Sequence, residues 1–251
     1  MEVHTHSHSA HGGAGTRKKF THYLWEFLML FLAVFCGFLA ENFREHQVES
    51  QREKQFIQSL IQNVKTDTVR LHDIIINRNE RMVNLDSLIT LINLPDPSPY
   101  SRYIYHHNSY ATRMTFRFYS NDGTMQQLKN AGNLRLIKKQ LVRDSIMSYD
   151  VASRLMMQSG NWEEEIMETY RVVAQEIFDG SELEKTRDEN NNVIRLEYNP
   201  PIKANKDAIF KLSYRIHMLK NFNRSNRKSN RDLLEQAANL LALLKKEYHL
   251  Q

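Results

Sequence analysis

The residues best suited to metal chemistry stand at the start of the chain. His4, His6 and His8 alternate within a short polar stretch, and imidazole is a good ligand for zinc, copper or nickel. No carboxylate or thiolate follows at a matching spacing, and no neighbouring side chain is placed to orient the rings. Residues 1–20 are polar, basic and rich in small side chains, so they cannot bury a core. We expect a disordered, solvated tail, with these histidines as weak candidate ligands and with no resident metal or other cofactor.

The chain lacks the motifs of familiar catalytic sites. It contains no G-x-x-x-x-G-K-[ST], G-x-G-x-x-G, G-x-S-x-G or H-E-x-x-H. Its single cysteine, Cys36, lies in an apolar run, where a reactive thiolate is disfavoured. Because no cluster of acid, base and nucleophile can be named, we expect no enzyme activity.

A segment rich in aromatic and arginine side chains, Tyr100–Tyr119, is the strongest candidate for recognition. Aromatic residues and arginine dominate interface hot spots, so Tyr103, Tyr105, Arg113 and Arg117 could bind a partner or an anionic ligand. The alternative is an irregular connection whose aromatic rings pack on neighbouring helices. We expect this aromatic connection to cover residues 95–123.

One apolar run must position everything that follows it. Tyr23–Ala40 holds eighteen residues, of which only Glu26 is charged. A helix of that length rises roughly 27 Å, close to the hydrocarbon thickness of a bilayer. A cleaved signal peptide is disfavoured by the long polar stretch before the run, and a buried core helix by its lack of any polar face. We expect a transmembrane helix over residues 21–43.

The start of this run has the features of a membrane interface. The rings of Tyr23 and Trp25 suit the headgroup layer. Glu26 lies about one turn deeper, where a carboxylate could pair with another subunit or carry protons. The favoured alternative is a side chain that reaches back to the interface beside His22.

Small residues recur within the run. Ala33, Gly37 and Ala40 form a stripe at helical spacing, and such stripes let helix backbones approach closely. The stripe is weak support for a homo-oligomer, so the expected partners are the bilayer and another protein or a second copy.

The charge distribution favours one orientation and excludes one class of partner. Arg17, Lys18 and Lys19 precede the run, which predicts a cytoplasmic N-terminus and a periplasmic domain in the inner membrane. The net charge is +5, but the basic residues are not interleaved with aromatic ones as in nucleic-acid-binding surfaces. We therefore expect no nucleic-acid partner.

Residues 44–251 are patterned as a helical domain, which makes the fold class mainly α with a long-helix, coiled-coil-like bundle. No proline or glycine interrupts the chain between Gly37 and Pro95, and we expect this helix to run antiparallel to a later one. The spacing predicts a seam whose two polar members, Asp67 and Arg78, form interhelical pairs or set the register between helices. The seam residues are Leu60, Val64, Asp67, Leu71, Ile74, Arg78, Met82, Leu85, Ile89 and Ile92.

The second half of the domain is also predicted to be helical. A long helix should end at Asp179–Gly180, a suitable C-cap, before a polar loop over about 180–205 with a short strand at 193–198. The acidic triplet Glu163–Glu165 is read as a solvated face.

Two blocks of the sequence resemble a known family. The first is the span with Asn42-Phe43-Arg44-Glu45, followed by Lys54, Phe56, Leu60 and Asp67. The second is Thr124-x3-Leu128-x3-Gly132-Asn133-Leu134-x2-Ile137 with Leu141, Arg143 and Tyr149. Together they resemble a family of uncharacterised single-pass membrane proteins of the Bacteroidetes, although Phe43 replaces the usual tryptophan. The resemblance implies an N-terminal anchor and a helical soluble domain, and it implies no activity.

These observations predict a membrane-anchored helical scaffold or protein-interaction module. The alternative is an envelope sensor or regulator that binds a ligand or partner through the Tyr100–Tyr119 segment, and an enzyme is the least favoured class.

Overall fold

The computed structural model describes residues 15–113, 116–130, 132–203 and 205–250, and within them the chain is mainly helical. The mainly α class predicted from the sequence is confirmed. The long helices are α1 (Gly15–Ile92), α4 (Gln140–Ala174) and α6 (Lys206–Tyr248). The shorter elements are η1 (Ser98–Tyr100), α2 (Ser101–Ala111), α3 (Gly123–Asn130), η2 (Asn133–Leu136) and α5 (Gly180–Glu184).

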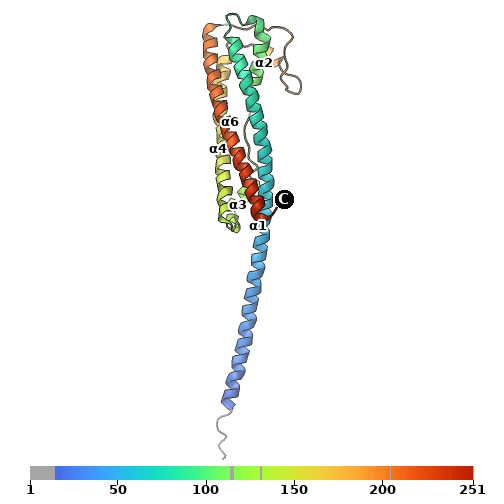
Figure 1. The fold of residues 1–251 in the computed structure, drawn as a ribbon, viewed down its shortest axis with the longest axis vertical. Coiled ribbons are helices and arrows are strands. Elements are labelled where there is room, and N and C mark those ends of the chain that lie inside the picture. The colour runs from blue at the N-terminus through green and yellow to red at the C-terminus, as the bar shows by residue number, and fades with distance from the viewer. Residues whose placement is uncertain (1–14, 114–115, 131, 204, 251) are drawn as a thin grey trace, which may run out of the picture. The chain divides into compact units, whose positions relative to one another are not determined.

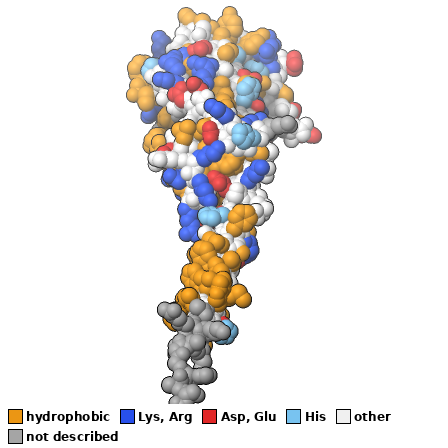
Figure 2. All heavy atoms as spheres, turned by 60° about the horizontal axis from the view of Figure 1, so that its bottom comes forward, with side chains coloured by type: hydrophobic (Ala, Val, Ile, Leu, Met, Phe, Trp, Pro, Cys, Tyr) orange, Lys and Arg blue, Asp and Glu red, His pale blue; other side chains and the backbone are white. Residues whose placement is uncertain are grey.

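The chain divides into two units, residues 1–53 and 54–251. The described part of the first unit belongs to α1 and carries the apolar run. This is the one helix of the described chain that is long and apolar enough to cross a membrane, and none of its apolar window is buried. Figure 2 shows its hydrophobic side chains gathered on the surface. The rings of Phe27, Phe31 and Phe35 stack along one side, with successive centroids 6.3 and 5.9 Å apart.

The second unit is built on three long helices that lie side by side: α1 from Lys54 onward, α4 and α6 (Figure 1). Helix α6 runs antiparallel to α1, as polar contacts along the two helices show, and this confirms the predicted antiparallel pairing. Helix α4 runs parallel to α1. The α1–α6 contacts are Asn79 with Arg227, Asp86 with Lys220 and Asn93 with Ser213, and the α1–α4 contacts are Asp67 with Tyr149 and Arg81 with Glu163.

The predicted seam of α1 forms the core. Leu60, Leu71 and Leu85 are buried, whereas Ile89 is only half-buried and Leu88 is buried instead. The burial keeps a strict seven-residue repeat, with Arg78, Arg81, Leu85, Leu88 and Ile92 buried, so the predicted members Met82 and Ile89 each lie one residue off the seam.

Two separate hydrophobic clusters fill the bundle. The first lies around Leu71, Ile146 and Leu240, and the second around Leu88, Tyr170 and Ile216. The level between them carries buried polar residues instead of apolar ones. We call these six residues the polar layer: Arg78, Arg81, Glu163, Asn223, Asn226 and Asn230.

Two predictions about the second half are wrong. Helix α4 ends at Ala174, and Asp179 is the N-cap of α5, because its carboxylate accepts a hydrogen bond from the Ser181 amide at 2.8 Å. Asp suits this role, since its short side chain satisfies free amides at a helix start. No strand forms at 193–198: within the described residues this region has only an isolated bridge between Arg187 and Val193.

Candidate functional site

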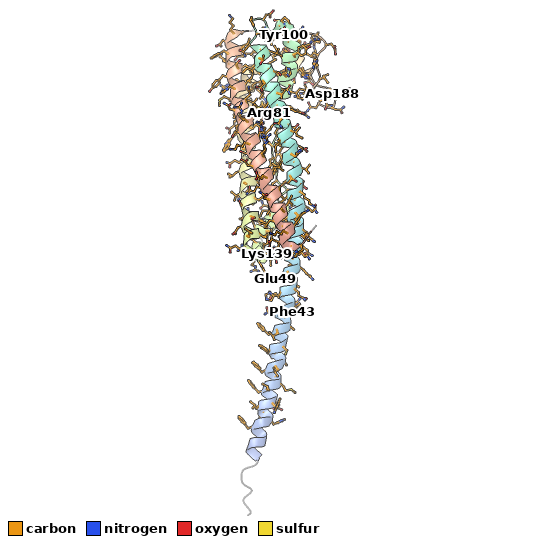
Figure 3. All side chains as sticks on the ribbon, viewed as in Figure 1. Phe43, Glu49, Arg81, Tyr100, Lys139 and Asp188 are labelled. Atoms are coloured by element: carbon orange, nitrogen blue, oxygen red, sulfur yellow. The ribbon has the colours of Figure 1, made fainter. Side chains whose placement is uncertain are left out.

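The centre of the polar layer is a buried ionic cluster of Arg78 and Arg81 from α1 and Glu163 from α4. The three residues are 1%, 2% and 6% exposed. One carboxylate oxygen of Glu163 accepts from Nη2 of Arg78 at 2.7 Å, and the other accepts from Nη1 of Arg81. Figure 3 shows Arg81 between the helices. One carboxylate thus serves two buried guanidinium groups, which leaves one positive charge in excess.

Helix α6 completes the coordination of Arg78 with asparagine side chains. Nε of Arg78 donates to Oδ1 of Asn230 at 3.0 Å, and Nη1 donates to Oδ1 of Asn223 at 3.1 Å. The amide of Asn223 donates back to the main-chain carbonyl of Arg78 at 2.9 Å. Charged donors with several satisfied partners are the form in which buried arginine is tolerated.

Burial and charge act in opposite directions on these groups. Burial raises the pKa of the Glu163 carboxyl, but the charges and hydrogen bonds of Arg78 and Arg81 outweigh it and hold that pKa below its ordinary value. Burial lowers the pKa of Arg81 to about 10; the charge of Arg78 acts in the same sense, and Glu163 opposes both. Glu163 and Arg81 are therefore charged at neutral pH.

The same arginines hold an extended segment, which we define as residues 113–122 apart from 114 and 115. This segment has no strand to pair with among the described residues, so its main-chain polar groups need other partners. Helix α1 supplies them at four levels. Three arginines of α1 donate to main-chain carbonyls of the segment: Arg81 to Arg113 (2.8 Å), Arg78 to Phe116 (3.3 Å) and Arg70 to Tyr119 (2.7 Å). In the opposite direction, the main-chain amide of Asn121 donates to the carboxylate of Asp67 at 2.8 Å.

Aromatic side chains reinforce this docking. Phe116 and Phe118 are 6% and 2% exposed and pack into the first hydrophobic cluster. The guanidinium carbon of Arg81 lies 4.1 Å from the centroid of the Phe116 ring, a cation–π arrangement that stabilises a buried cation. Asp67 also accepts from the Tyr149 hydroxyl at 2.9 Å, so the predicted interhelical role of Asp67 and Arg78 is confirmed.

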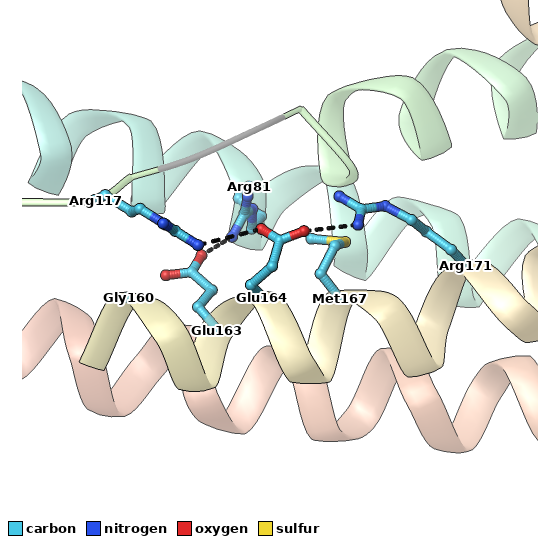
Figure 4. Close-up of a pocket in the computed structure, with 7 residues that line it drawn as sticks. All are labelled: Arg81, Arg117, Gly160, Glu163, Glu164, Met167 and Arg171. Atoms are coloured by element: carbon cyan, nitrogen blue, oxygen red, sulfur yellow. Dashed lines mark hydrogen bonds and ion pairs between the residues drawn. The ribbon is translucent and has the colours of Figure 1, made fainter. Parts of the chain in front are cut away.

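A small cavity adjoins the cluster (Figure 4). Its volume is about 10 Å³, and Gly160 and Met167 line it together with charged residues. Among its lining residues, Glu164 accepts from Arg171 at 2.7 Å and lies 3.8 Å from Arg117. A volume of this size holds about one water molecule and no organic ligand.

The structure separates the four residues predicted as a partner surface. Tyr105 is fully buried in α2, where its hydroxyl donates to the Pro201 carbonyl at 3.0 Å and accepts from the Asp179 amide at 2.8 Å. Tyr103 is half-buried in the same helix. Arg113 is exposed, and Arg117 is half-buried beside α4.

The ring of Tyr103 is flanked by two cations. The guanidinium carbons of Arg102 and Arg195 lie 4.8 and 5.0 Å from its centroid. The aromatic connection thus contains a helix, α2.

The side chains singled out in the apolar run are all exposed. Tyr23 and Trp25 are each 65% exposed, and Nε2 of His22 lies 3.3 Å from Glu26, which is the pairing expected of a carboxylate that reaches back along the helix. The small-residue stripe of Ala33, Gly37 and Ala40 is also exposed. A Cβ atom added to Gly37 would have no other atom within 4 Å, so nothing in the described chain packs against the stripe there.

The candidate metal ligands His4, His6 and His8 lie outside the described residues. Within the residues that are described, no group of three or more histidine, cysteine, aspartate or glutamate side chains is placed to hold a metal ion.

Sequence reasoning placed Arg78 on the seam, but it missed Arg81 and misjudged Glu163. Glu163 was assigned to a solvated face because it opens an acidic triplet, and that is wrong: it shares the buried face of α4 with Met156, Met167 and Tyr170. Arg81 lies on the buried three-four repeat of α1 between Arg78 and Leu85, where the predicted seam had Met82 instead. The signal that could have located the α6 partners is Asn223, Asn226 and Asn230, which recur among its buried apolar positions.

The fold and the site define a mainly α chain with an exposed apolar helix segment and a three-helix bundle crossed by a buried ionic layer. No protein-family model, curated protein or solved structure matches it.

Proposed function

We propose that this protein is a membrane-anchored helical scaffold or protein-interaction module, with its N-terminus in the cytoplasm and its bundle in the periplasm. The observation that carries the proposal is the apolar run of α1, whose large side chains Phe27, Leu30 and Val34 are 65–72% exposed. Exposure of this kind is costly in water and normal in lipid.

The bundle supports an architectural role. Its interior is filled by two apolar clusters and an ionic layer, and the cavity beside that layer holds no more than about one water molecule. The resemblance to single-pass membrane proteins of the Bacteroidetes is retained as part of the same proposal.

Membrane fractionation of the full chain tests the anchor. We expect the protein to stay in the membrane pellet after alkaline carbonate extraction and to keep its first residues, as N-terminal mass analysis would show. Release by carbonate would contradict the anchor, and a mature chain that begins after the run would identify a cleaved signal sequence instead.

Topology is tested separately with reporters fused after Gln251. A phosphatase that is active only outside the cytoplasm should work, and a fluorescent protein that matures only inside should stay dark. Replacing Arg17, Lys18 and Lys19 with glutamine should give mixed orientations, because the positive charge that holds the N-terminal flank in the cytoplasm is then removed. Fluorescence without phosphatase activity would place the bundle in the cytoplasm.

A further inference from the structure

The small cavity beside the ionic cluster is surrounded by charged side chains from three parts of the chain. Three arginines line it: Arg81 from α1, Arg117 from the extended segment and Arg171 from α4. Figure 4 shows their side chains converging on Glu163 and Glu164, which also line the cavity. The lining therefore carries one more positive charge than negative.

The charged residues that contact this lining leave the excess in place. Arg78 adds a positive charge, since its Nη2 donates to the Glu163 carboxylate at 2.7 Å. Glu168 adds a negative charge, 3.1 Å from Nη1 of Arg171. A buried cation whose charge is not balanced is unfavourable, so an anion held in the cavity would stabilise the bundle.

Two guanidinium nitrogen atoms of the lining also have no acceptor. Nε of Arg81 and Nε of Arg117 are buried, and neither has a hydrogen-bond partner among the described residues. Nη2 of Arg117 lies 3.8 Å from Glu164, which is beyond hydrogen-bond distance. Because buried donors without an acceptor are unfavourable, an acceptor in the cavity that both arginines line would satisfy them.

Gly160 makes room for one of these donors. A Cβ atom added to Gly160 would lie 3.0 Å from Cγ and 3.6 Å from Nε of Arg117. The shorter distance is tighter than ordinary van der Waals contact, so a larger residue would displace the arginine. Glycine is a poor helix former, and the close approach of Arg117 gives it a structural role in the middle of α4.

We propose that this cavity binds a chloride ion, held by Nε of Arg81 and Nε of Arg117. The volume of about 10 Å³ admits one small particle and excludes larger polyatomic anions. A water molecule would supply an acceptor only, whereas chloride also neutralises the excess positive charge.

The two carboxylates at the cavity do not prevent anion binding. Glu163 is engaged by Arg78 and Arg81, and Glu164 accepts from Arg171, so their negative charges are already balanced by arginine. Glu164 and Arg171 are partly exposed, which gives the ion a route from solvent. Because chloride at this site binds only the folded bundle, it should raise the melting temperature.

The test uses the full chain in detergent micelles, with chloride as the probe and gluconate as its replacement at constant ionic strength. Chlorine NMR line widths report bound chloride directly, and micelles without protein give the background. We expect the protein to broaden the chloride signal. Bromide, which is also monatomic, should displace the bound ion, whereas sulfate at the same ionic strength should not.

Two variants alter the cavity by different means. Arg117→Gln removes one donor, and Gly160→Ala displaces the same arginine while favouring the helix. Each should weaken chloride binding at least about tenfold, as expected when a charged hydrogen bond is lost. Each should also remove the rise in melting temperature with chloride, while circular dichroism shows that the helices are retained. The matched control Arg224→Gln, at an exposed site on α6, should behave as the unaltered chain does.

Three outcomes would overturn the proposal. Broadening no greater than the micelle background would show that the cavity takes water and no anion. Equal broadening in the unaltered chain and in both cavity variants would indicate an adventitious ion only, at exposed basic side chains. Displacement by sulfate as effective as that by bromide would contradict a site for a monatomic ion. Since the cavity lies in the second unit, failure of the membrane anchor would appear in fractionation and would leave these results unchanged.

Discussion

Asn223 and Arg78 exchange hydrogen bonds: the guanidinium donates to the asparagine side chain at 3.1 Å, and the asparagine amide donates to the arginine main chain at 2.9 Å. One residue of α6 thus contacts both the side chain and the backbone of one residue of α1. A buried polar contact of this kind favours a single register between two helices, because a shift along the axis would leave both partners unsatisfied.

Removing the shared carboxylate should be far more damaging than removing its exposed neighbour. We expect Glu163→Ala to lower the free energy of unfolding by about 3–5 kcal/mol, because two buried guanidinium groups lose their counter-charge. Glu165→Ala, two residues away and exposed, should change it by less than about 0.5 kcal/mol. Urea unfolding of the full chain in detergent measures both, and equal losses would contradict the assigned role of Glu163.

The cluster should also make stability depend on acid. The folded-state pKa of Glu163 lies below its ordinary value of 4.5, so its stabilising contribution is complete above that value and is lost as pH falls through the folded pKa. Urea midpoints measured from pH 6 to about pH 3 should therefore fall less steeply for Glu163→Gln than for the unaltered chain. Glu165→Gln should retain the full slope, and a parallel loss in both variants would assign the acid sensitivity to other carboxyls.

The seam of α1 can be tested by truncating a core leucine. Leu71 is fully buried, whereas Val69, two residues before it, is 63% exposed. Leu71→Ala should cost about 2–5 kcal/mol, and Val69→Ala should have little effect on the melting temperature. An unchanged melting temperature for Leu71→Ala would show that this side chain is not packed in solution.

Docking of the extended segment should depend on Asp67. This carboxylate accepts from the Asn121 amide, the Ser120 hydroxyl and the Tyr149 hydroxyl at 2.7–2.9 Å. Asp67→Ala leaves these donors without their acceptor and should cost about 1–3 kcal/mol. Hydrogen–deuterium exchange over residues 116–122 should accelerate, whereas the exposed Asp73→Ala should leave it unchanged. Protection that persists in Asp67→Ala would mean that Phe116 and Phe118 suffice to hold the segment.

The long helices and their apolar faces could be predicted from the sequence because their signals are local. Leu60, Leu71 and Leu85 recur at helical spacing without a proline or glycine between them, and the structure buries all three. Leu88 was missed because the predicted seam placed Met82 after Arg78, whereas the buried positions keep the alternating three-four spacing from Arg78 through Leu85 to Leu88.

The buried ionic cluster was harder to predict because its members and partners come from three helices. Glu163 and Glu165 are the same residue type but lie on different faces of α4. Because they belong to one run of three glutamates, the sequence alone does not indicate that only Glu163 faces the core. The three-four repeat of α1 places Arg81 on the buried face. Phe116 and the Arg113 carbonyl contact it there, and no local pattern around Arg81 indicates where that distant segment packs.

The polar layer also bears on how cooperatively the bundle unfolds. Apolar side chains around Leu71 and around Leu88 form separate clusters, so few hydrophobic contacts cross the level of Arg78. Hydrogen bonds with charged partners have strict geometry and are lost together when one helix moves. The two halves of the bundle are therefore expected to behave as distinct foldons, with the layer of arginine, glutamate and asparagine as the boundary at which sub-global opening stops.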